Sequence, residues 1–236
     1  LNLHFKDRKE WSSKYDAFNG WKERIENVGV LIFQISGIKV EEMRGYSIPK
    51  TPYPTIVVNR SDSVLGRIFT LAHEFCHLML MKGGICTISR GEEEKHYKIE
   101  KFCNAAAGEA LVPKDILLKN KIILKSKPSK KWNEDDLRQL SKEFWASKEV
   151  ILRRLSDLNK ASKKYYQQKR EQWSKRTTPR TSEGGPPPYR KVISGHSKNY
   201  LNIVLNAMDN REITMHDASY YLGMSLKHLP KLREHL

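Results

Sequence analysis

The segment that most restricts the fold of this chain is Leu71–Leu80, which reads LAHEFCHLML. Its residues are apolar in nearly every direction around a helical wheel, which is typical of a helix buried in a protein core. The same segment carries two histidines and a glutamate, and burying such groups without partners costs on the order of several kcal/mol. The core around this predicted helix must therefore supply a metal ion or a dense hydrogen-bond network.

The two histidines, His73 and His77, are four residues apart. Because an α-helix advances about 100° per residue, they lie roughly 40° apart on one face, one turn above the other. Two imidazoles in this arrangement can bind one metal ion, and Glu74 projects close enough to accept a proton from a water that the metal activates. This is the HExxH arrangement of zinc peptidases. A histidine pair satisfied by hydrogen bonds alone is the alternative, and the apolar flanks lead us to favour the metal site.

A zinc peptidase needs three protein ligands, and the HExxH segment supplies only two. Helical spacing predicts a further helix over about 93–111, ending before Pro113, in which Glu100 and Asn104 lie one turn apart. We predict that Glu100 is the third ligand and that Asn104 hydrogen-bonds the far nitrogen of a ligand histidine. A solvated surface carboxylate is the alternative for Glu100. The rival acidic residues are Glu92, Glu93, Glu94 and Glu109.

The residues before the HExxH segment predict a small sheet that leads into the metal-bearing helix. The expected elements are a helix over 11–27 and strands over 28–34, 39–47 and 55–59. We expect Gly45 to interrupt the second strand. Ser61 or Asp62 is expected to cap the HExxH helix, which would run to about Met81. The expected fold class is α+β, with a small, mostly antiparallel sheet.

The second half of the chain is strongly basic. Of the net charge of +16, the segment from Lys114 to Lys191 contributes most, with 22 Lys or Arg against 9 Asp or Glu. Such a surface favours a polyanion or an acidic partner, and a solvated lysine-rich face without a ligand is an equal alternative. Nucleic acid is therefore a candidate partner of the basic half.

Two segments of this half have the apolar spacing of a helix-turn-helix unit. In the first, over 136–155, Ser147 can cap the second helix, but Trp145 occupies the turn position where glycine is usual. In the second, over 213–232, Gly223 is present at that position. Both units serve in other proteins as packing modules as well as DNA readers, so the spacing alone does not choose between these roles.

Cysteine usage and hydropathy favour a cytoplasmic protein. The three cysteines, Cys76, Cys86 and Cys103, lack the spacing of a metal ribbon or a redox motif and are expected to be free thiols. No apolar run has the length needed to cross a bilayer, and no signal peptide opens the sequence, so we expect no membrane partner. Because the first residue is Leu1, we expect an upstream segment to precede this chain.

These residues resemble the ImmA/IrrE family of metallo-endopeptidases. The resemblance covers residues 25 to about 160 and is carried by TIVVN at 55–59, RIFTLAHEFCHLML at 67–80, GGIC at 83–86 and IEKFCNAAAGEALVP at 99–113. It implies a zincin-like domain in which His73, His77 and Glu100 bind the metal and Glu74 is the base. Some such peptidases follow an Xre-type DNA-binding domain, which this sequence lacks.

With this resemblance, we expect four parts in the chain. They are a zincin-like metallopeptidase domain over 1–125, a helix-turn-helix-like helical region over 126–175, a flexible Pro/Gly-rich linker over 176–192 and a C-terminal helical element over 193–236. The metal implied is Zn²⁺, with Mn²⁺ left open. An edge strand, either 28–34 or 55–59, is expected to hold the substrate by strand addition.

The family's activity implies site-specific cleavage of a helix-turn-helix repressor or antitoxin, which releases stress-response, mobile-element or toxin genes. A competing hypothesis is a DNA-binding regulator or antitoxin whose metal site is structural or vestigial. Glu74 argues against that hypothesis, because a structural site needs no base beside its ligands. A third hypothesis is self-cleavage in the linker near Gly184. The sequence does not indicate the oligomeric state.

Overall fold

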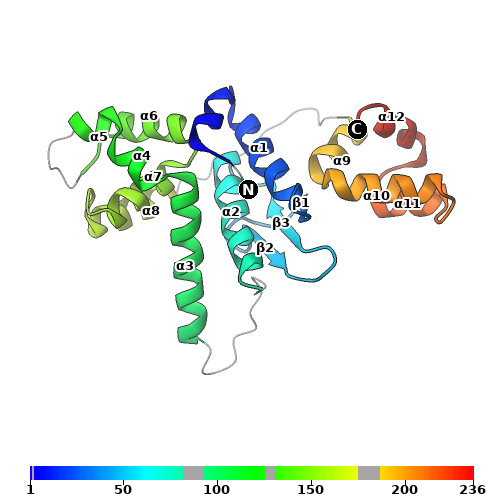
Figure 1. The fold of residues 1–236 in the computed structure, drawn as a ribbon, viewed down its shortest axis with the longest axis horizontal. Coiled ribbons are helices and arrows are strands. Elements are labelled where there is room, and N and C mark those ends of the chain that lie inside the picture. Colours follow the sequence, from blue (N-terminus) through cyan, green and yellow to red (C-terminus); the bar gives the residue numbers. More distant parts are fainter. Residues whose placement is uncertain (2, 82–92, 126–130, 175–186) are drawn as a thin grey trace.

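The computed structural model describes residues 1, 3–81, 93–125, 131–174 and 187–236 (Figure 1). The elements up to and including the two helices that carry the predicted ligands are η1 (Phe5–Glu10), α1 (Lys14–Glu26), β1 (Leu31–Ile35), β2 (Gly45–Ile48), β3 (Thr55–Asn59), α2 (Val64–Met79) and α3 (Glu93–Leu111). They are followed by α4 (Lys114–Leu118), α5 (Lys121–Lys125), α6 (Glu134–Phe144), α7 (Lys148–Asp157) and α8 (Lys163–Ser174). The C-terminal elements are α9 (Pro188–Gly195), α10 (Lys198–Asp209), α11 (Met215–Leu222), η2 (Leu226–His228) and α12 (Leu229–Glu234). A helix long and apolar enough to cross a membrane is absent from the described ranges.

The sheet has three strands in the order β1-β3-β2, and the fold is a mixed α+β one. β1 pairs with β3 in parallel, whereas β2 pairs with β3 antiparallel. The expectation of a mostly antiparallel sheet is therefore wrong for one of the two pairings. The chain leaves β1, passes to the far edge of the sheet and returns through β2, so that β3 runs in the same direction as β1. The TIVVN strand, β3, is the central strand of the sheet, and four of its five residues are buried there.

Gly45 begins β2 instead of interrupting a longer strand, and residues 39–44 form turns and bends. A Cβ atom at this position would lie 2.7 Å from the carbonyl oxygen of Val57 and closer still to the Cγ2 atom of Thr70 on α2. Only glycine allows the sheet and α2 to approach each other this closely. The glycine therefore sets the distance between the sheet and the HExxH helix.

The N-cap of the HExxH helix α2 lies one residue after Asp62 and two after Ser61, the two predicted caps. Its N-cap is Ser63, whose hydroxyl accepts a hydrogen bond from the Gly66 N–H at 3.0 Å, while Asp62 accepts one from the Ser63 N–H at 2.7 Å. The helix is buried along most of its length, as its composition predicts. Helix α3 lies beside it and has the predicted bounds (Figure 1).

Helices α6 and α7 pack on the same hydrophobic core as the sheet and α1–α3. Trp145 connects them in the left-handed conformation, with φ of 52°, and its indole N–H donates to the Arg8 carbonyl at 3.2 Å. Ser147 caps α7 by accepting from the Val150 N–H at 3.2 Å, as predicted. The tight turn thus forms without glycine because the indole gains a hydrogen bond and packing. The use of this pair as a helix-turn-helix unit stays a prediction.

The C-terminal elements have a hydrophobic core of their own. Helix α9 begins at Pro188, inside the range 176–192 that was expected to be linker, because proline is well suited to the first position of a helix. Gly223 ends α11 in the left-handed conformation, with φ of 62°, at the predicted turn. Residues 175–186, most of the expected linker, lie outside the described residues, and the expected boundaries near 125 and 175 stay predictions.

The C-terminal core docks on α1 and β1, on the side of the sheet away from α3 (Figure 1). Lys22 Nζ donates to the His196 carbonyl at 2.7 Å, and Asn199 Nδ2 donates to the Glu26 carbonyl at 3.1 Å. The ring of Phe33 meets that of Tyr200 edge to face, with centroids 5.1 Å apart. These contacts leave the opposite edge, β2, on the side of the pocket described below.

The close approach at Gly45 gives a stability prediction. We expect Gly45→Ala to lower the free energy of unfolding by about 1–3 kcal/mol, because the added methyl group meets backbone as well as side-chain atoms. Gly195→Ala is the matched control, since its Cβ would lie 3.6 Å from the nearest atom, the Gln34 carbonyl oxygen. Urea denaturation measures both changes. Equal effects at the two positions would contradict the proposed role of Gly45.

Candidate metal centre

The two histidines of α2 and Glu100 of α3 converge on one point. The Nε2 atoms of His73 and His77 lie 3.1 Å apart. One carboxylate oxygen of Glu100 is 3.3 Å from His73 Nε2, and the other is 2.9 Å from His77 Nε2. The structure therefore brings together the three predicted ligands. Among the described residues, they form the one group of His, Cys, Asp or Glu side chains close enough together to hold a metal ion.

The spacing of these atoms fits a tetrahedral metal ion. Ligand atoms at about 2.0–2.1 Å from a tetrahedral zinc lie about 3.3 Å from one another. The three observed separations, 2.9, 3.1 and 3.3 Å, are close to this value. Two neutral imidazole nitrogens facing each other can share at most one proton, so a cation satisfies the cluster better than hydrogen bonds do. Two histidines and a carboxylate are also a donor set that zinc enzymes use.

Glu74 lies beside the cluster and is buried. Its Oε2 atom accepts a hydrogen bond of 2.8 Å from the hydroxyl of Ser47, on β2. Burial raises the pKa of Glu74, while the Ser47 hydrogen bond and the nearby His73 and His77 act in the opposite direction. A carboxylate whose pKa is raised is a better proton acceptor, as a general base requires. No sequence pattern pointed to Ser47, because its contact with Glu74 depends on how the sheet packs against α2.

The charge of the cluster favours a cation. Hydrogen bonds from His73 and His77 hold the pKa of Glu100 far below its usual range, so this carboxylate is anionic at neutral pH. The Glu100 hydrogen bond in turn raises the pKa of His77, against the effect of burial. The third predicted ligand therefore brings a negative charge to the two imidazoles at neutral pH.

Asn104 does not take the predicted role. Its side-chain nitrogen donates to the backbone carbonyl of Glu100 at 2.8 Å, and its side-chain oxygen accepts from Arg153 NH1 at 2.9 Å. The Nδ1 atoms of His73 and His77 are buried, and no described residue hydrogen-bonds them. Asn104 lies one turn along α3, so its amide reaches its own helix and α7 instead of the imidazoles on α2. It connects α7 to the helix that carries Glu100.

The rival acidic residues have other partners. Glu94 is exposed and pairs with Lys98 at 2.7 Å. Glu109 pairs with Arg154 and accepts from the Lys114 N–H at 2.9 Å. Glu92 and the side chain of Glu93 lie outside the described residues. Glu100 is thus the acidic residue that the described part of α3 presents to the histidines.

Two cysteines lie on the same pair of helices but outside the cluster. Cys103 is buried, and burial together with a hydrogen bond to Cys76 raises the pKa of its thiol, so that it stays protonated. Cys76 is half-buried and unoxidised, and Cys86 lies outside the described residues. Both described cysteines are free thiols, as the sequence predicts.

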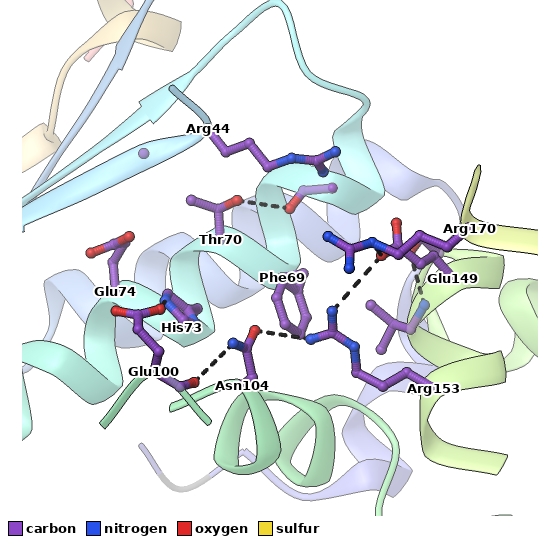
Figure 2. A pocket seen from close by; sticks show the side chains of 14 residues that line it. Arg44, Phe69, Thr70, His73, Glu74, Glu100, Asn104, Glu149, Arg153 and Arg170 are labelled. Carbon is purple, nitrogen blue, oxygen red and sulfur yellow. Dashed lines mark hydrogen bonds and ion pairs between the residues drawn. The ribbon is translucent and has the colours of Figure 1, made fainter. Parts of the chain in front are cut away.

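A pocket of about 290 Å³ borders the cluster (Figure 2). Glu74, His73 and Glu100 lie at one end of it, and three arginines, Arg44, Arg153 and Arg170, extend towards the other end. The remaining lining residues are Gly45, Gly66, Phe69, Thr70, Asn104, Ser147, Glu149 and Val150. The sequence did not point to the arginines, because they come from the loop before β2, from α7 and from α8.

The geometry gives a prediction for metal binding. We expect Zn²⁺ at about 100 times its dissociation constant to stabilise the protein by about 3 kcal/mol, seen as a rise in melting temperature. His77→Ala should abolish the rise. His96→Ala is the control and should keep it, because His96 Nε2 is 3.9 Å from Glu100 and is not part of the cluster. Failure of every divalent cation to shift the wild-type melting temperature would contradict the site.

Of the comparisons with known proteins, the one with protein families gives a match. No curated protein and no solved structure gives a significant match to the chain. The sequence pattern of the peptidase M78 family, described as the IrrE N-terminal-like domain, matches residues 25–156, which is more than half of the chain. The matched range contains His73, Glu74, His77 and Glu100, and it extends through most of α7. The chain therefore belongs to the peptidase M78 family.

Proposed function

We propose that this protein is a zinc-dependent endopeptidase. The observation that carries the proposal is the convergence of His73, His77 and Glu100 with a buried Glu74 beside them. Membership of a peptidase family supports the same reaction class. The His and Glu donor set favours Zn²⁺, and Mn²⁺ is the alternative to be compared in the same binding experiment.

The side chains have distinct roles in the proposed hydrolysis. A zinc ion held by the three ligands supplies Lewis-acid chemistry, which makes water more acidic and polarises the peptide carbonyl. Glu74 accepts a proton from the attacking water and passes it to the amine that leaves. The Ser47 hydrogen bond holds the Glu74 carboxylate in one orientation. Glu100 and the histidines stay in place as ligands throughout.

Strand β2 is the proposed site of strand addition. The expected alternatives were 28–34 and 55–59, but β3 (Thr55–Asn59) is central and paired on both sides, so it cannot accept another strand. β1 is an edge strand, but α9 of the C-terminal core packs against it. β2 is the other edge; it carries Ser47 next to Glu74, and its first residue, Gly45, lines the pocket. An extended peptide added to β2 would pass directly over the catalytic carboxylate.

The proposed substrate is a helix-turn-helix transcriptional repressor or antitoxin of a stress-response, mobile-element or toxin–antitoxin system, cut at one site in the cytoplasm. The resemblance to ImmA/IrrE peptidases supports this choice. The size of the pocket, about 290 Å³, agrees with a protease that accepts a short extended segment and not a folded surface. Self-cleavage near Gly184 is a weaker proposal, and that residue lies outside the described ranges.

The alternative function is a DNA-binding regulator or antitoxin with a structural or vestigial metal site. The basic charge of residues 114–191 and the tight turns at Trp145 and Gly223 favour it. Against it stands Glu74, which is buried and hydrogen-bonded beside the ligands although a structural site gains nothing from a base. The two functions differ in their dependence on this one carboxylate.

Replacing the base tests the proposal. We expect Glu74→Gln to bind Zn²⁺ as the wild type does and to lose cleavage of a helix-turn-helix repressor by about 10²–10⁴-fold, the usual contribution of a general base. Purified repressors are incubated with metal-loaded protein, and their fragments are identified by mass spectrometry.

Glu94→Gln is the matched control, because Glu94 is an exposed residue of α3 paired with Lys98. It should cleave at the wild-type rate. A shortened form of the protein itself, absent in Glu74→Gln, would indicate self-cleavage. Cleavage that survives Glu74→Gln would reject the catalytic role, and binding of operator DNA without any cleavage would favour the alternative function.

A further inference from the structure

The end of the pocket away from the metal cluster has an excess of positive charge. Arg44 NH1 is 3.3 Å from Asp62, and Glu149 is shared between Arg153, at 3.8 Å, and Arg170, at 3.5 Å. Three guanidinium groups therefore face two carboxylates. The cluster end of the same pocket carries the carboxylates of Glu74 and Glu100, which attract cations and repel anions (Figure 2). The pocket thus has negative charge at the cluster end and an excess of positive charge at the arginine end.

Two of the three arginines keep donors for a ligand. The side chains of Arg44 and Arg170 are 59% and 63% exposed. Among the described residues, Arg44 contacts Asp62 through NH1, and Arg170 contacts Glu149 through Nε. An arginine has five N–H donors, so most of those on both residues remain for an anion that enters the pocket. Both guanidinium groups are largely exposed although their partners Asp62 and Glu149 are not, so an incoming carboxylate can share the free N–H donors without breaking the present ion pairs.

Arg153 forms a fixed positive wall behind these two residues. It donates to the Tyr166 hydroxyl at 3.0 Å and to Asn104 at 2.9 Å, and its guanidinium lies 5.4 Å from the centre of the Phe69 ring. Its side chain is only 22% exposed. Because these partners hold Arg153 in place, it contributes a charge of constant position, whereas Arg44 and Arg170 provide the hydrogen bonds.

Helix α2 gives the scale of the pocket. Phe69 and Gly66 line it, four and seven residues before His73. A rise of 1.5 Å per residue places these positions about 6 and 10 Å along the helix from the first metal ligand. An extended peptide advances about 3.3 Å per residue, so this span corresponds to two or three residues of substrate.

We propose that the arginine end of the pocket binds a carboxylate of the substrate, two or three residues from the scissile bond. This inference rests on the endopeptidase function proposed above and adds a specificity to it. The carboxylate belongs to an Asp or Glu side chain, or to the substrate's C-terminus, since both present the same planar anion to a guanidinium. Arg44 and Arg170 are the specificity-determining residues, and the Phe69 ring supplies the apolar floor between them and the cluster.

A peptide series tests this specificity. The probes are neutral decapeptides with a fluorescent label, in which one Glu is placed at each position in turn, each paired with the same peptide carrying Gln. Every peptide is made with a free and with an amidated C-terminus. We expect Glu two or three residues from the cut to raise kcat/KM about 5- to 10-fold over Gln, and less at high salt. If amidation instead lowers kcat/KM of the Glu and the Gln peptide alike, the substrate's C-terminus is the source of the carboxylate.

The Arg44→Gln/Arg170→Gln double variant should bring the Glu-to-Gln ratio close to one. The ratio is measured within one protein, so a general loss of folding or activity cancels. Arg138→Gln is the matched control, because Arg138 is 62% exposed and pairs with Asp135 on α6, outside the pocket. It should keep the wild-type ratio. Equal cleavage by the wild type of Glu and Gln peptides and also of free and amidated peptides, or a preference unchanged in the double variant, would overturn the inference.

A binding measurement separates this inference from the proposed function. The same labelled peptides are titrated with zinc-loaded Glu74→Gln protein and followed by fluorescence anisotropy, so no cleavage is needed. Tighter binding of Glu peptides than of Gln peptides, lost in a variant that also carries Arg44→Gln and Arg170→Gln, supports the arginine site even if the wild type cuts nothing. Absence of cleavage alone rejects the peptidase proposal, and equal binding of Glu and Gln peptides together with equal binding of free and amidated peptides rejects the carboxylate site.

Discussion

The contact between the imidazoles of α2 and the carboxylate of α3 determines how this protein is built. Buried His77 and its neighbour His73 need a charged or coordinating partner, and Glu100, on the next helix, supplies it at 2.9 and 3.3 Å. The requirement brings two helices side by side and leaves the third member of the HExxH pattern, Glu74, facing the sheet. Gly45 allows the sheet to come close enough for Ser47 to bond that carboxylate.

Proton equilibria of the cluster connect the stability of the fold with metal binding. The pKa of Glu100 is lowered from 4.5, so its stabilising effect is present above that value and is lost as the pH falls through the folded-state pKa. The pKa of His77 is raised from 6.5, so its effect is full below that value and is lost as the pH rises through the folded-state pKa. The metal-free cluster is therefore most favourable between these two reference values. At higher pH, His77 is neutral and a metal cation can replace the proton.

The sequence predicted the features that depend on neighbouring residues, and it missed those that depend on residues far apart in the chain. The bounds of helix α3 and strand β3 are as expected, and Ser147 caps α7 as expected. Apolar periodicity and capping act within a few residues, so the sequence records them. The closeness of His73 and His77 was also predictable, because residues four apart lie one above the other on a helix. The Ser47 contact and the partners of Asn104 depend on which elements become neighbours. The parallel pairing of β1 with β3 depends on the path of the chain through β2 at the far edge of the sheet, and no local sequence pattern specifies that path.

The cations of α7 bear on the choice between protease and DNA reader. A recognition helix needs basic side chains free to reach base edges or phosphates. Lys148 pairs with Glu134 at 2.7 Å, Arg153 is held by Asn104 and Tyr166, and Arg154 pairs with Glu109 and is almost fully buried. All three basic residues of α7 are thus engaged by the protein itself. Arg153 in particular lines the pocket beside the metal cluster, so this helix is better placed to contribute to the proposed peptide-binding site than to enter a DNA groove.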